Sequence, residues 1–531
     1  MDPLSITAAT VAFLTSLWKI GVKTADLIST YRDFDDDSKA LERRIRKEND
    51  LTRALHMLLF EPSRIYGGNC IFDQFDVDIQ DQIRVSLEQA MDTLNQAHQL
   101  LERRQRVSVE DRATDSKFPL LPTISPQATL SLSRLKWSLR DKKRLERIIL
   151  DFSEHNSAIH VQIKVWCLSM SAGVNLHHLK HLEEDENSRL LGFHVDASLL
   201  RANVELDRPH MDLEVHGPDV TPLVSNCTPF GDKFAVCTQQ GRPTLLEYRA
   251  YAPDIRVPVE PDNRTRQLVN SLANLLHQPT EVTFRTPHCN GWITQMQYNR
   301  VAFMFSIPEG VEPTPFTLLQ LLSSKDLPSP SLSDRLQLAL SLARCISQLQ
   351  LVKWVHESFR SENIMFFPRH SIQDETHSPE DRIALSQPWV FGFEFSRPDP
   401  FFSDGRPDMC LSRDIYRHPE RQQNPTHQFS KIHDIYALGV VLLEIGLWQP
   451  ALSLEKSGFS RVKDPRAIQK YLVKQAERRL ASRAGERYKD VVLKCLQGDF
   501  GVTHDTRDDT KLQQAFRSQV VDVLQRSASN I

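Results

Sequence analysis

The sequence predicts two folded parts, an N-terminal all-α helical bundle followed by an α+β bilobal domain. The 531 residues exceed what one ordinary core needs, since domains average roughly 150 residues. Apolar residues recur at helical spacing through the first third of the chain, and strand-like segments alternate with helices in the remainder. We expect domains over residues 1–182 and 216–531, a linker over 183–215, and a second domain divided into lobes at 216–310 and 311–531.

Composition and charge limit the kinds of partner. The formal net charge is -3, with 25% charged and 40% hydrophobic residues, which is ordinary for a soluble globular protein. Because no field of one sign covers the chain, we expect no nucleic-acid partner, and any membrane contact requires a local patch. The 8 cysteines are scattered and form no C-x-x-C pair. Such cysteines are typical of reduced intracellular proteins, so the default expectation is a cytoplasmic location.

Four apolar stripes predict the helices of the bundle. Each stripe advances by three or four residues, as one face of an α-helix does. Amphipathic helices bury such stripes against each other, and a bundle follows. The stripes are Leu4, Ala8, Val11, Leu14, Trp18, Val22, Ala25 and Ile28; Leu41, Ile45, Leu51, Leu55 and Leu58; Ile79, Ile83, Leu87, Met91, Leu94 and Leu101; and Leu135, Leu139, Leu145, Ile148, Phe152, Ile159, Ile163 and Trp166.

Two segments of the first part are expected to face solvent. Residues 105–130 are rich in proline, serine and threonine and predict an exposed loop. A group of histidines has helical ligand spacing, but no acid or cysteine completes a ligand set. We therefore expect no metal and a solvated helix end at His177, His178 and His181.

The first helix admits two interpretations. Residues 3–18 carry no charge, but they are fewer than the roughly 20 residues that a membrane span needs. This segment is either buried core or a membrane contact. A basic cluster before the last long helix is either a solvated helix face or a contact with anionic lipid, at about 1 kcal/mol per residue. Its members are Arg134, Lys136, Arg140, Lys142, Lys143, Arg144 and Arg147.

The first part resembles the HeLo or HeLo-like domain, the prion-inhibition and propagation module of filamentous fungi. The resemblance rests on the start from Met1 to Thr7, the uncharged first helix, and the segment from Lys136 to Lys143 that leads into the last long helix. Members of that family act in regulated cell death, and some insert their first helix into membranes. The resemblance thus implies self-association through the helical domain and membrane contact through residues 3–18.

A first motif in the second part lies at residues 354–366. His356 and Asn363 occur after a long helical stripe and before a short apolar run. Their spacing resembles the H-R-D-L-x-x-x-N motif of protein kinases, whose Asn binds metal. Arg360 stands where many kinases keep a basic residue toward the γ-phosphate. The position of the catalytic Asp is Ser358, and a serine hydroxyl is a poor base near neutral pH.

A second motif, at residues 389–397, stands in the place of the kinase D-F-G. One register puts Gly392 at the Asp and matches Arg397 to a common downstream Arg. A register shifted by two residues puts Glu394 there instead. Glycine cannot bind magnesium, and the extra methylene of glutamate would displace a geometry-demanding ion.

Two further segments resemble structural parts of a kinase. Residues 416–420 are similar to the A-P-E that ends the activation segment, with Glu420 at its acid. Residues 431–444 are similar to the buried helix that starts D-V-W-S-x-G-V, with Asp434 at the acid that holds the catalytic loop. The resemblance gives both acids structural roles.

The predicted N-lobe lacks the residues that hold ATP. No G-x-G-x-x-G occurs in residues 216–242, so the backbone cannot lie over phosphates in the usual way. The candidate third strand, 244–251, has no lysine, and Arg249 is its nearest cation. The candidate helix 264–277 has no glutamate, so neither partner of the kinase Lys–Glu pair is present. Residues 291–297 and 300–306 predict the fourth and fifth strands.

These losses favour one function and leave a rival. The leading interpretation is a catalytically inactive pseudokinase, joined to a HeLo-like module, that signals by binding protein partners and needs no cofactor. The rival is an atypical serine/threonine kinase that binds ATP and magnesium through Arg249, Asn363 and Glu394. A purely structural interaction module is a third alternative.

Overall fold

The structure of the chain is a computed structural model. It describes residues 3–30, 36–75, 77–115, 142–169, 176–204, 211–216, 227–239, 241–251, 257–277, 284–325, 328–370, 382–393, 397–398, 410–422, 427, 429–455, 459, 464–502, 505 and 509–529. The chain divides into two compact units, Met1–Ala197 and Ser198–Ile531. The first is helical and the second combines antiparallel sheets with helices, which confirms the coarse two-part prediction.

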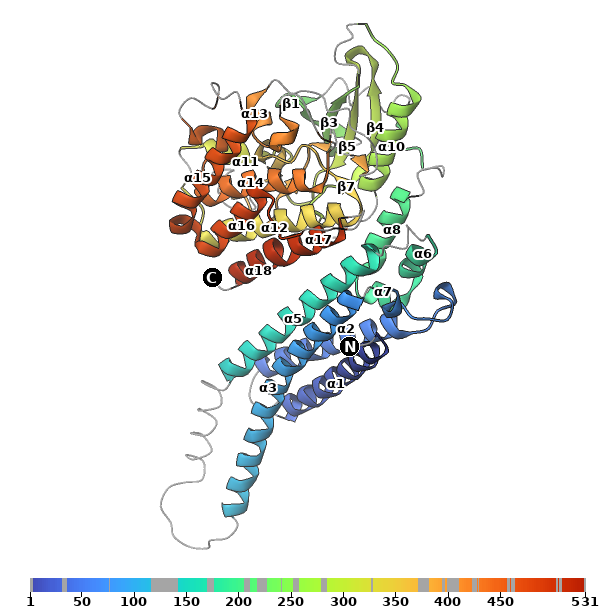
Figure 1. Cartoon of the computed structure of the whole chain (residues 1–531). Helices are drawn as coiled ribbons and strands as arrows, with labels where there is room; N and C mark the ends of the chain where they lie inside the picture. Colours follow the sequence, from blue (N-terminus) through green and yellow to red (C-terminus); the bar gives the residue numbers. More distant parts are fainter. Residues whose placement is uncertain are drawn as a thin grey trace. The chain divides into compact units, whose positions relative to one another are not determined.

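The first unit is built from long helices that pack side by side. The helix α1 packs against α2 and α3, and α5 packs against α3 and α2 (Figure 1). The described helices that lie in or begin in this unit are α1 (Pro3–Thr30), α2 (Asp36–Phe60), α3 (Val77–Asp115), α5 (Lys142–Ser169), α6 (Leu176–Glu184), α7 (Glu186–Leu190) and α8 (Phe193–Val204).

The buried face of α1 differs from the predicted stripe. Leu14, Ala25 and Ile28 are buried as predicted, but Ala8 and Trp18 are exposed. Ile6, Thr10 and Leu17 are buried in their place. The buried face in the first half of the helix is therefore offset from the predicted stripe, because helical spacing allows more than one choice of face in an apolar segment.

Three residues show how this interface closes. The hydroxyls of Thr10 and Thr24 donate to carbonyl oxygens one turn back in α1, at 2.8 and 2.7 Å, so both side chains are buried with a hydrogen-bond partner. A Cβ at Gly21 would overlap the side chain of Asn49 in α2. The absence of a side chain at Gly21 thus sets how closely α1 and α2 approach.

Three sequence predictions for this region are wrong. The helix α3 continues to Asp115, so the first residues of the predicted loop 105–130 are helical, and residues 116–130 lie outside the described part. The predicted linker contains α7 and α8, and Asp196 of α8 forms a buried ion pair with Lys164 of α5. His178 is buried rather than solvated and hydrogen bonds to the Cys167 carbonyl at 2.8 Å. Tertiary contacts, which short polar segments do not reveal, order these residues.

The second unit begins with a 5-stranded antiparallel sheet of order β1-β2-β3-β5-β4. The helix α10 packs against β4. The predicted third, fourth and fifth strands and the predicted helix 264–277 are all present. The elements are β1 (Thr228–Phe230), β2 (Phe234–Gln239), β3 (Arg242–Ala250), α10 (Asn263–His277), β4 (Cys289–Gln295) and β5 (Arg300–Ser306).

Residues 211–216, at the junction of the predicted linker and the second domain, attach to the outer edge of β4. The Val215 N–H donates to the Trp292 carbonyl at 2.8 Å, and the Trp292 N–H donates to the Leu213 carbonyl at 3.0 Å. Asn270 of α10 holds this segment, which we call the strap. Its side chain accepts from the Leu213 N–H at 3.0 Å and donates to the Met211 carbonyl at 3.0 Å. The strap covers backbone groups that an edge strand would otherwise leave open.

The remaining helices form the other end of this unit (Figure 1). The helix α14 is buried along almost its whole length and carries the acids of the site. The elements are β6 (Phe316–Thr317), α11 (Leu318–Ser323), α12 (Leu332–Leu351), β7 (Trp354–Val355), β8 (Ile364–Phe366), β9 (Trp389–Val390), β10 (Arg397–Pro398), α13 (Leu411–Asp414), α14 (Lys431–Leu447), α15 (Pro465–Ala484), α16 (Glu486–Gln497), α17 (Thr510–Phe516) and α18 (Asp522–Ser529).

Replacing Gly21 by leucine is expected to destabilise the first unit. Leucine favours helix over glycine by about 0.8–1 kcal/mol, so any loss of stability reports the packing against Asn49. Overpacking should cost about 1–3 kcal/mol in unfolding free energy, measured by urea denaturation of the full chain. Ala12→Leu, at an exposed position of the same helix, is the control. Equal stability of the two variants would contradict this account of the interface.

Candidate functional site

Asp434 of α14 shapes the loop that follows β7. Its carboxylate accepts hydrogen bonds from the His356 N–H at 2.7 Å and from the Glu357 N–H at 3.0 Å. Glu357 has a φ of 59°, in the left-handed region that non-glycine residues seldom adopt. Two charge-assisted hydrogen bonds that one buried carboxylate accepts help hold this conformation. The sequence predicted a scaffolding role for Asp434, and these are the contacts that such a role would use.

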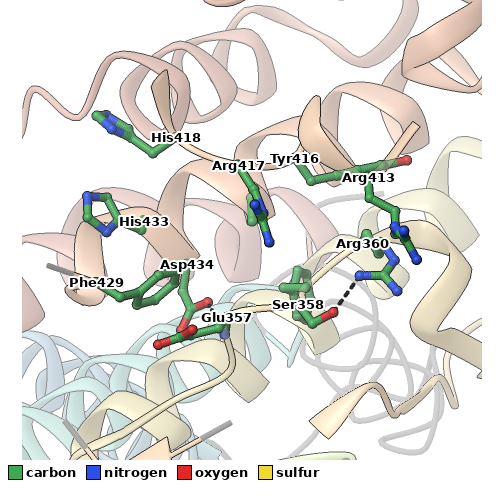
Figure 2. Close-up of a pocket in the computed structure, with 12 residues that line it drawn as sticks. Glu357, Ser358, Arg360, Arg413, Tyr416, Arg417, His418, Phe429, His433 and Asp434 are labelled. Atoms are coloured by element: carbon green, nitrogen blue, oxygen red, sulfur yellow. Dashed lines mark hydrogen bonds between the residues drawn. The ribbon is translucent and has the colours of Figure 1, made fainter. Parts of the chain in front are cut away.

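The loop brings Ser358, Arg360 and Asn363 together. The Asn363 side chain donates to the Ser358 carbonyl at 2.7 Å and to the Ser358 hydroxyl oxygen at 3.2 Å. Arg360 donates to the same hydroxyl oxygen, as Figure 2 shows. A serine oxygen has two lone pairs, and these donors occupy both. Ser358 is therefore poorly placed to accept a proton.

His356 is the first residue of this loop, and its imidazole ring is neutral near pH 7. It is fully buried, and burial lowers its pKa to about 3, with the positive charge of Arg360 acting in the same direction. Its Nδ1 accepts a hydrogen bond from the Ser358 N–H at 3.3 Å. The ring of His356 packs against Phe393 with a centroid distance of 5.0 Å. These contacts make His356 a structural residue of the loop.

The carboxylate of Glu247, in the sheet, lies close to the loop that carries Asn363. Glu247 of β3 is buried, and its Oε2 accepts from the Gly392 N–H at 3.1 Å. Gly392 has a φ of 88°, and a Cβ there would overlap the Asn363 side chain. The chain from Glu247 through Gly392 to Asn363 thus joins the sheet to the loop by direct contact. Any residue other than glycine at position 392 would displace the Asn363 side chain.

The predicted nucleotide-binding residues are only partly described. Arg249 lies two residues beyond Glu247 in β3, so both side chains project from the same face of the sheet. Glu394 lies outside the described residues. Sequence reasoning missed Glu247, although an acid inside an apolar strand pattern was a visible signal.

Glu420 lies among three histidines rather than alone. Its Oε2 is 3.4 Å from the Nε2 of His433, 3.6 Å from the Nδ1 of His418 and 4.0 Å from the Nδ1 of His427. His418, Glu420 and His433 converge closely enough to raise the question of a metal ion.

The hydrogen bonds of His433 do not fit a metal ligand. Its Nδ1 accepts the Ser430 N–H at 3.0 Å, within the capping box of α14. Burial lowers the pKa of His433 to about 4, so its ring is neutral near pH 7 and carries its single proton on Nε2. That proton points at Glu420, and a metal would have to replace it. The cluster is better described as a hydrogen-bonded structural group.

Glu444, near the end of α14, is the second residue that sequence reasoning missed. Its side chain is fully buried, and its Oε1 accepts from the Tyr416 hydroxyl and from the Ala451 N–H, each at 2.7 Å. Tyr416 also shares a hydrogen bond of 2.8 Å with the Ser361 hydroxyl. Burial raises the pKa of Glu444 to about 7 despite these donors. The sequence did signal this residue, because Glu444 is the one acid in an otherwise apolar run near the end of α14.

Two pockets meet at Arg360 and Tyr416. One, drawn in Figure 2, contains Ser358 and the guanidinium groups of Arg413 and Arg417. The other is an open pocket of about 620 Å³ that contains Glu444.

One family match covers part of the second unit. Residues 311–530 match a family described as a domain of unknown function, DUF7580. The match runs from just before β6 to the end of α18 and leaves out the 5-stranded sheet. No curated protein matches the chain. The similarity therefore supplies no activity, and function has to be inferred from the site.

Replacing Glu444 by glutamine is expected to stabilise the second unit at alkaline pH. The folded-state pKa is about 7, above the ordinary value of 4.5, so the stability that protonation supplies is present below pH 4.5 and is lost as pH rises through 7. Glutamine does not ionise, so the gain should be about 1–3 kcal/mol near pH 8 and should vanish near pH 5.

Thermal unfolding of the full chain at both pH values measures this effect. Glu477→Gln, at an exposed position of α15, is the matched control and should change stability at neither pH. A destabilised Glu444→Gln variant at pH 8 would show instead that the ionised carboxylate supports the fold.

Proposed function

We propose that the chain is a signalling or scaffold protein that works by binding. In this proposal the second unit is a kinase-like domain that does not transfer phosphate, and the first unit is a HeLo-like module for cell death or self-association. The second unit would sense a partner, and the first unit would produce the response. The location that fits is the cytoplasm, with membrane association when the output acts.

The observation that carries the proposal is the contact chain Glu247–Gly392–Asn363. In kinases the D-F-G acid and the catalytic-loop Asn both hold magnesium, so they must lie side by side. Gly392 is the residue that lies against Asn363, which favours the register with Gly392 at the acid. A carboxylate, Glu247, then occupies the face of β3 from which a kinase lysine would reach the phosphates. Its negative charge would repel them.

The loop geometry supports the same conclusion. Both lone pairs of the Ser358 oxygen are engaged by Asn363 and Arg360. Phosphoryl transfer relies on positioning and on neutralising charge, and in this register Ser358 stands at the position of the base and Gly392 at that of the metal-binding acid. Asp434 nevertheless keeps the loop in shape. A preserved scaffold without the chemistry fits a protein that presents a surface to partners.

The outward face of α1 supports a membrane-directed output. Residues Ser5–Ser29 are long and apolar enough to cross a membrane by length and composition, and 28% of their most apolar stretch is buried. Trp18 is 37% exposed on this face, next to exposed Lys19. Tryptophan beside lysine suits the boundary between water and anionic lipid.

A second candidate function is an atypical ATP-binding kinase. The retention of Asn363 and the projection of Arg249 from the same sheet face as Glu247 are the observations in its favour. It requires Glu394 to supply the metal-binding acid. Nucleotide binding separates the two candidates.

We expect millimolar ATP to leave the thermal unfolding of the full chain unchanged, with or without magnesium. A ligand at 100 times its dissociation constant would add about 2.7 kcal/mol of stability, which is readily visible. A magnesium-dependent shift that disappears in Asn363→Ala would favour the atypical kinase. A shift without magnesium would favour a nucleotide-sensing pseudokinase.

We expect the full chain to bind vesicles that contain phosphatidylserine, and Trp18→Glu to reduce the bound fraction several-fold. The exposed position of Trp18 means that the substitution leaves the buried face of α1 intact. Leu190→Glu, at an exposed apolar residue of α7 (67% exposed), is the control. Co-sedimentation measures binding, and equal sedimentation of all three proteins would exclude α1 as the contact.

A further inference from the structure

Two cysteines lie opposite each other at one edge of the 5-stranded sheet. The edge strand β1 pairs with β2 in antiparallel register, and the pair at the start of β1 is Thr228 with Val236. One step further along the same register, Cys227 stands opposite Cys237. Opposed residues of antiparallel strands have Cα atoms about 4.5–5.5 Å apart. That separation lies within the range of about 4.4–6.8 Å that disulfides span.

The side chains of these two cysteines also meet. Cys237 belongs to an apolar cluster of the sheet, and Cys227 packs against that cluster together with Tyr248. A hydrogen bond joins the two thiols. Two sulfur atoms that are already in contact, on strands at this separation, can form a bond with little movement of the backbone.

The two thiols differ in their access to solvent. Cys227 is partly exposed, whereas Cys237 is 3% exposed, so an oxidant dissolved in water meets Cys227 first. Burial raises the pKa of both thiols, that of Cys237 to about 12. The hydrogen bond from Cys237 and the charge of Arg300 act in the opposite direction on the pKa of Cys227. Reactive cysteines commonly occupy such partly exposed positions beside a positive charge.

Arg300 of β5 supplies the positive charge near Cys227. Its guanidinium carbon lies 3.5 Å from the ring centroid of Tyr248 and 4.6 Å from that of Tyr298. Its Nε donates to the Gln295 side chain at 2.7 Å. These three contacts are with neutral groups, so they do not cancel the charge. A thiolate at Cys227 would be stabilised by it, and the thiolate is the form of cysteine that reacts with oxidants.

We propose that Cys227 and Cys237 form a reversible redox site, at which a peroxide converts the two thiols into a disulfide that ties β1 to β2. The Cys227 sulfur attacks one oxygen of hydrogen peroxide, the O–O bond breaks, and the products are a sulfenic acid and water. The Cys237 sulfur then loses its proton and attacks the Cys227 sulfur, so that an S–S bond forms and the S–O bond breaks with release of a second water. The two thiols lose two electrons and two protons, and the peroxide takes up both.

A disulfide at this place would be reversible. Disulfides in the cytoplasm are usually transient or redox-sensing, because glutathione and thioredoxin keep thiols reduced. A small thiol can reopen a disulfide by attacking its accessible sulfur, which here is that of Cys227. The strand β1 has 3 residues, so the cross-link would add a covalent tie where the backbone pairing is short. Oxidation requires neither a nucleotide nor a partner protein, so its outcome is independent of the proposed function.

The test uses the full chain, which is reduced, freed of reductant and treated with hydrogen peroxide. Remaining thiols are blocked with iodoacetamide in urea, and tryptic peptides are mapped by mass spectrometry. Trypsin separates the two cysteines, because Lys233 lies between them. We expect a cross-linked peptide that contains Cys227 and Cys237 and disappears with dithiothreitol. Alkylation of the two cysteines should fall several-fold together.

Three variants separate a paired site from general oxidation. Cys410→Ser removes another partly exposed cysteine and should keep the cross-link. Cys227→Ser should abolish the cross-link and leave Cys237 open to alkylation. Cys237→Ala should leave Cys227 as a sulfenic acid. Dimedone, which labels that group, should then label Cys227 several-fold more than in the wild-type chain.

The wild-type measurement by itself can overturn the proposal, whether or not a variant folds. Full alkylation of Cys227 and Cys237 after peroxide treatment would overturn it. A disulfide that joins either cysteine to a different cysteine, or to a second copy of the chain, would overturn it too. Dimedone labelling of Cys237 in Cys227→Ser, to the extent seen for Cys227 in Cys237→Ala, would overturn the order of attack.

Discussion

The hydrogen bonds from the backbone N–H groups of His356 and Glu357 to Asp434 are the contact on which the second unit depends. They tie the loop after β7 to α14, which is buried along almost its whole length. Removing the carboxylate would leave two N–H groups without an acceptor, one of them fully buried, at about 1–3 kcal/mol each. Everything that the loop positions, including Ser358 and Asn363, depends on this pair of bonds.

The same helix carries a second acid of opposite character. Asp434 accepts from two backbone N–H groups, whereas Glu444 accepts from the Tyr416 hydroxyl and the Ala451 N–H. Burial raises the pKa of Glu444 to about 7, so its ionised form opposes folding above that pH.

The sheet and the loop of the second unit are joined by direct contacts. Glu247 accepts from the Gly392 N–H, and Gly392 lies against Asn363. These contacts link β3 to the loop that carries Ser358 and Asn363.

In the first unit, small residues decide how the helices pack. Gly21 and the self-bonded hydroxyls of Thr10 and Thr24 face the neighbouring helices, while Trp18 faces outward. The large apolar residues Leu14, Leu17 and Ile28 are buried beside them, so α1 combines close helix contacts with an ordinary apolar interface.

The sequence by itself determined the two-part fold, the central strands and the long helices, because periodicity and short motifs are local properties. Tertiary structure alone decided which face of α1 is buried, that the expected linker folds as helices and a strap, and that Glu247 and Glu444 belong to sites. Those outcomes depend on what packs against each residue. The burial of an acid and the fit of a glycine against Asn49 or Asn363 are relations between distant segments, which the order of residues along the chain does not display.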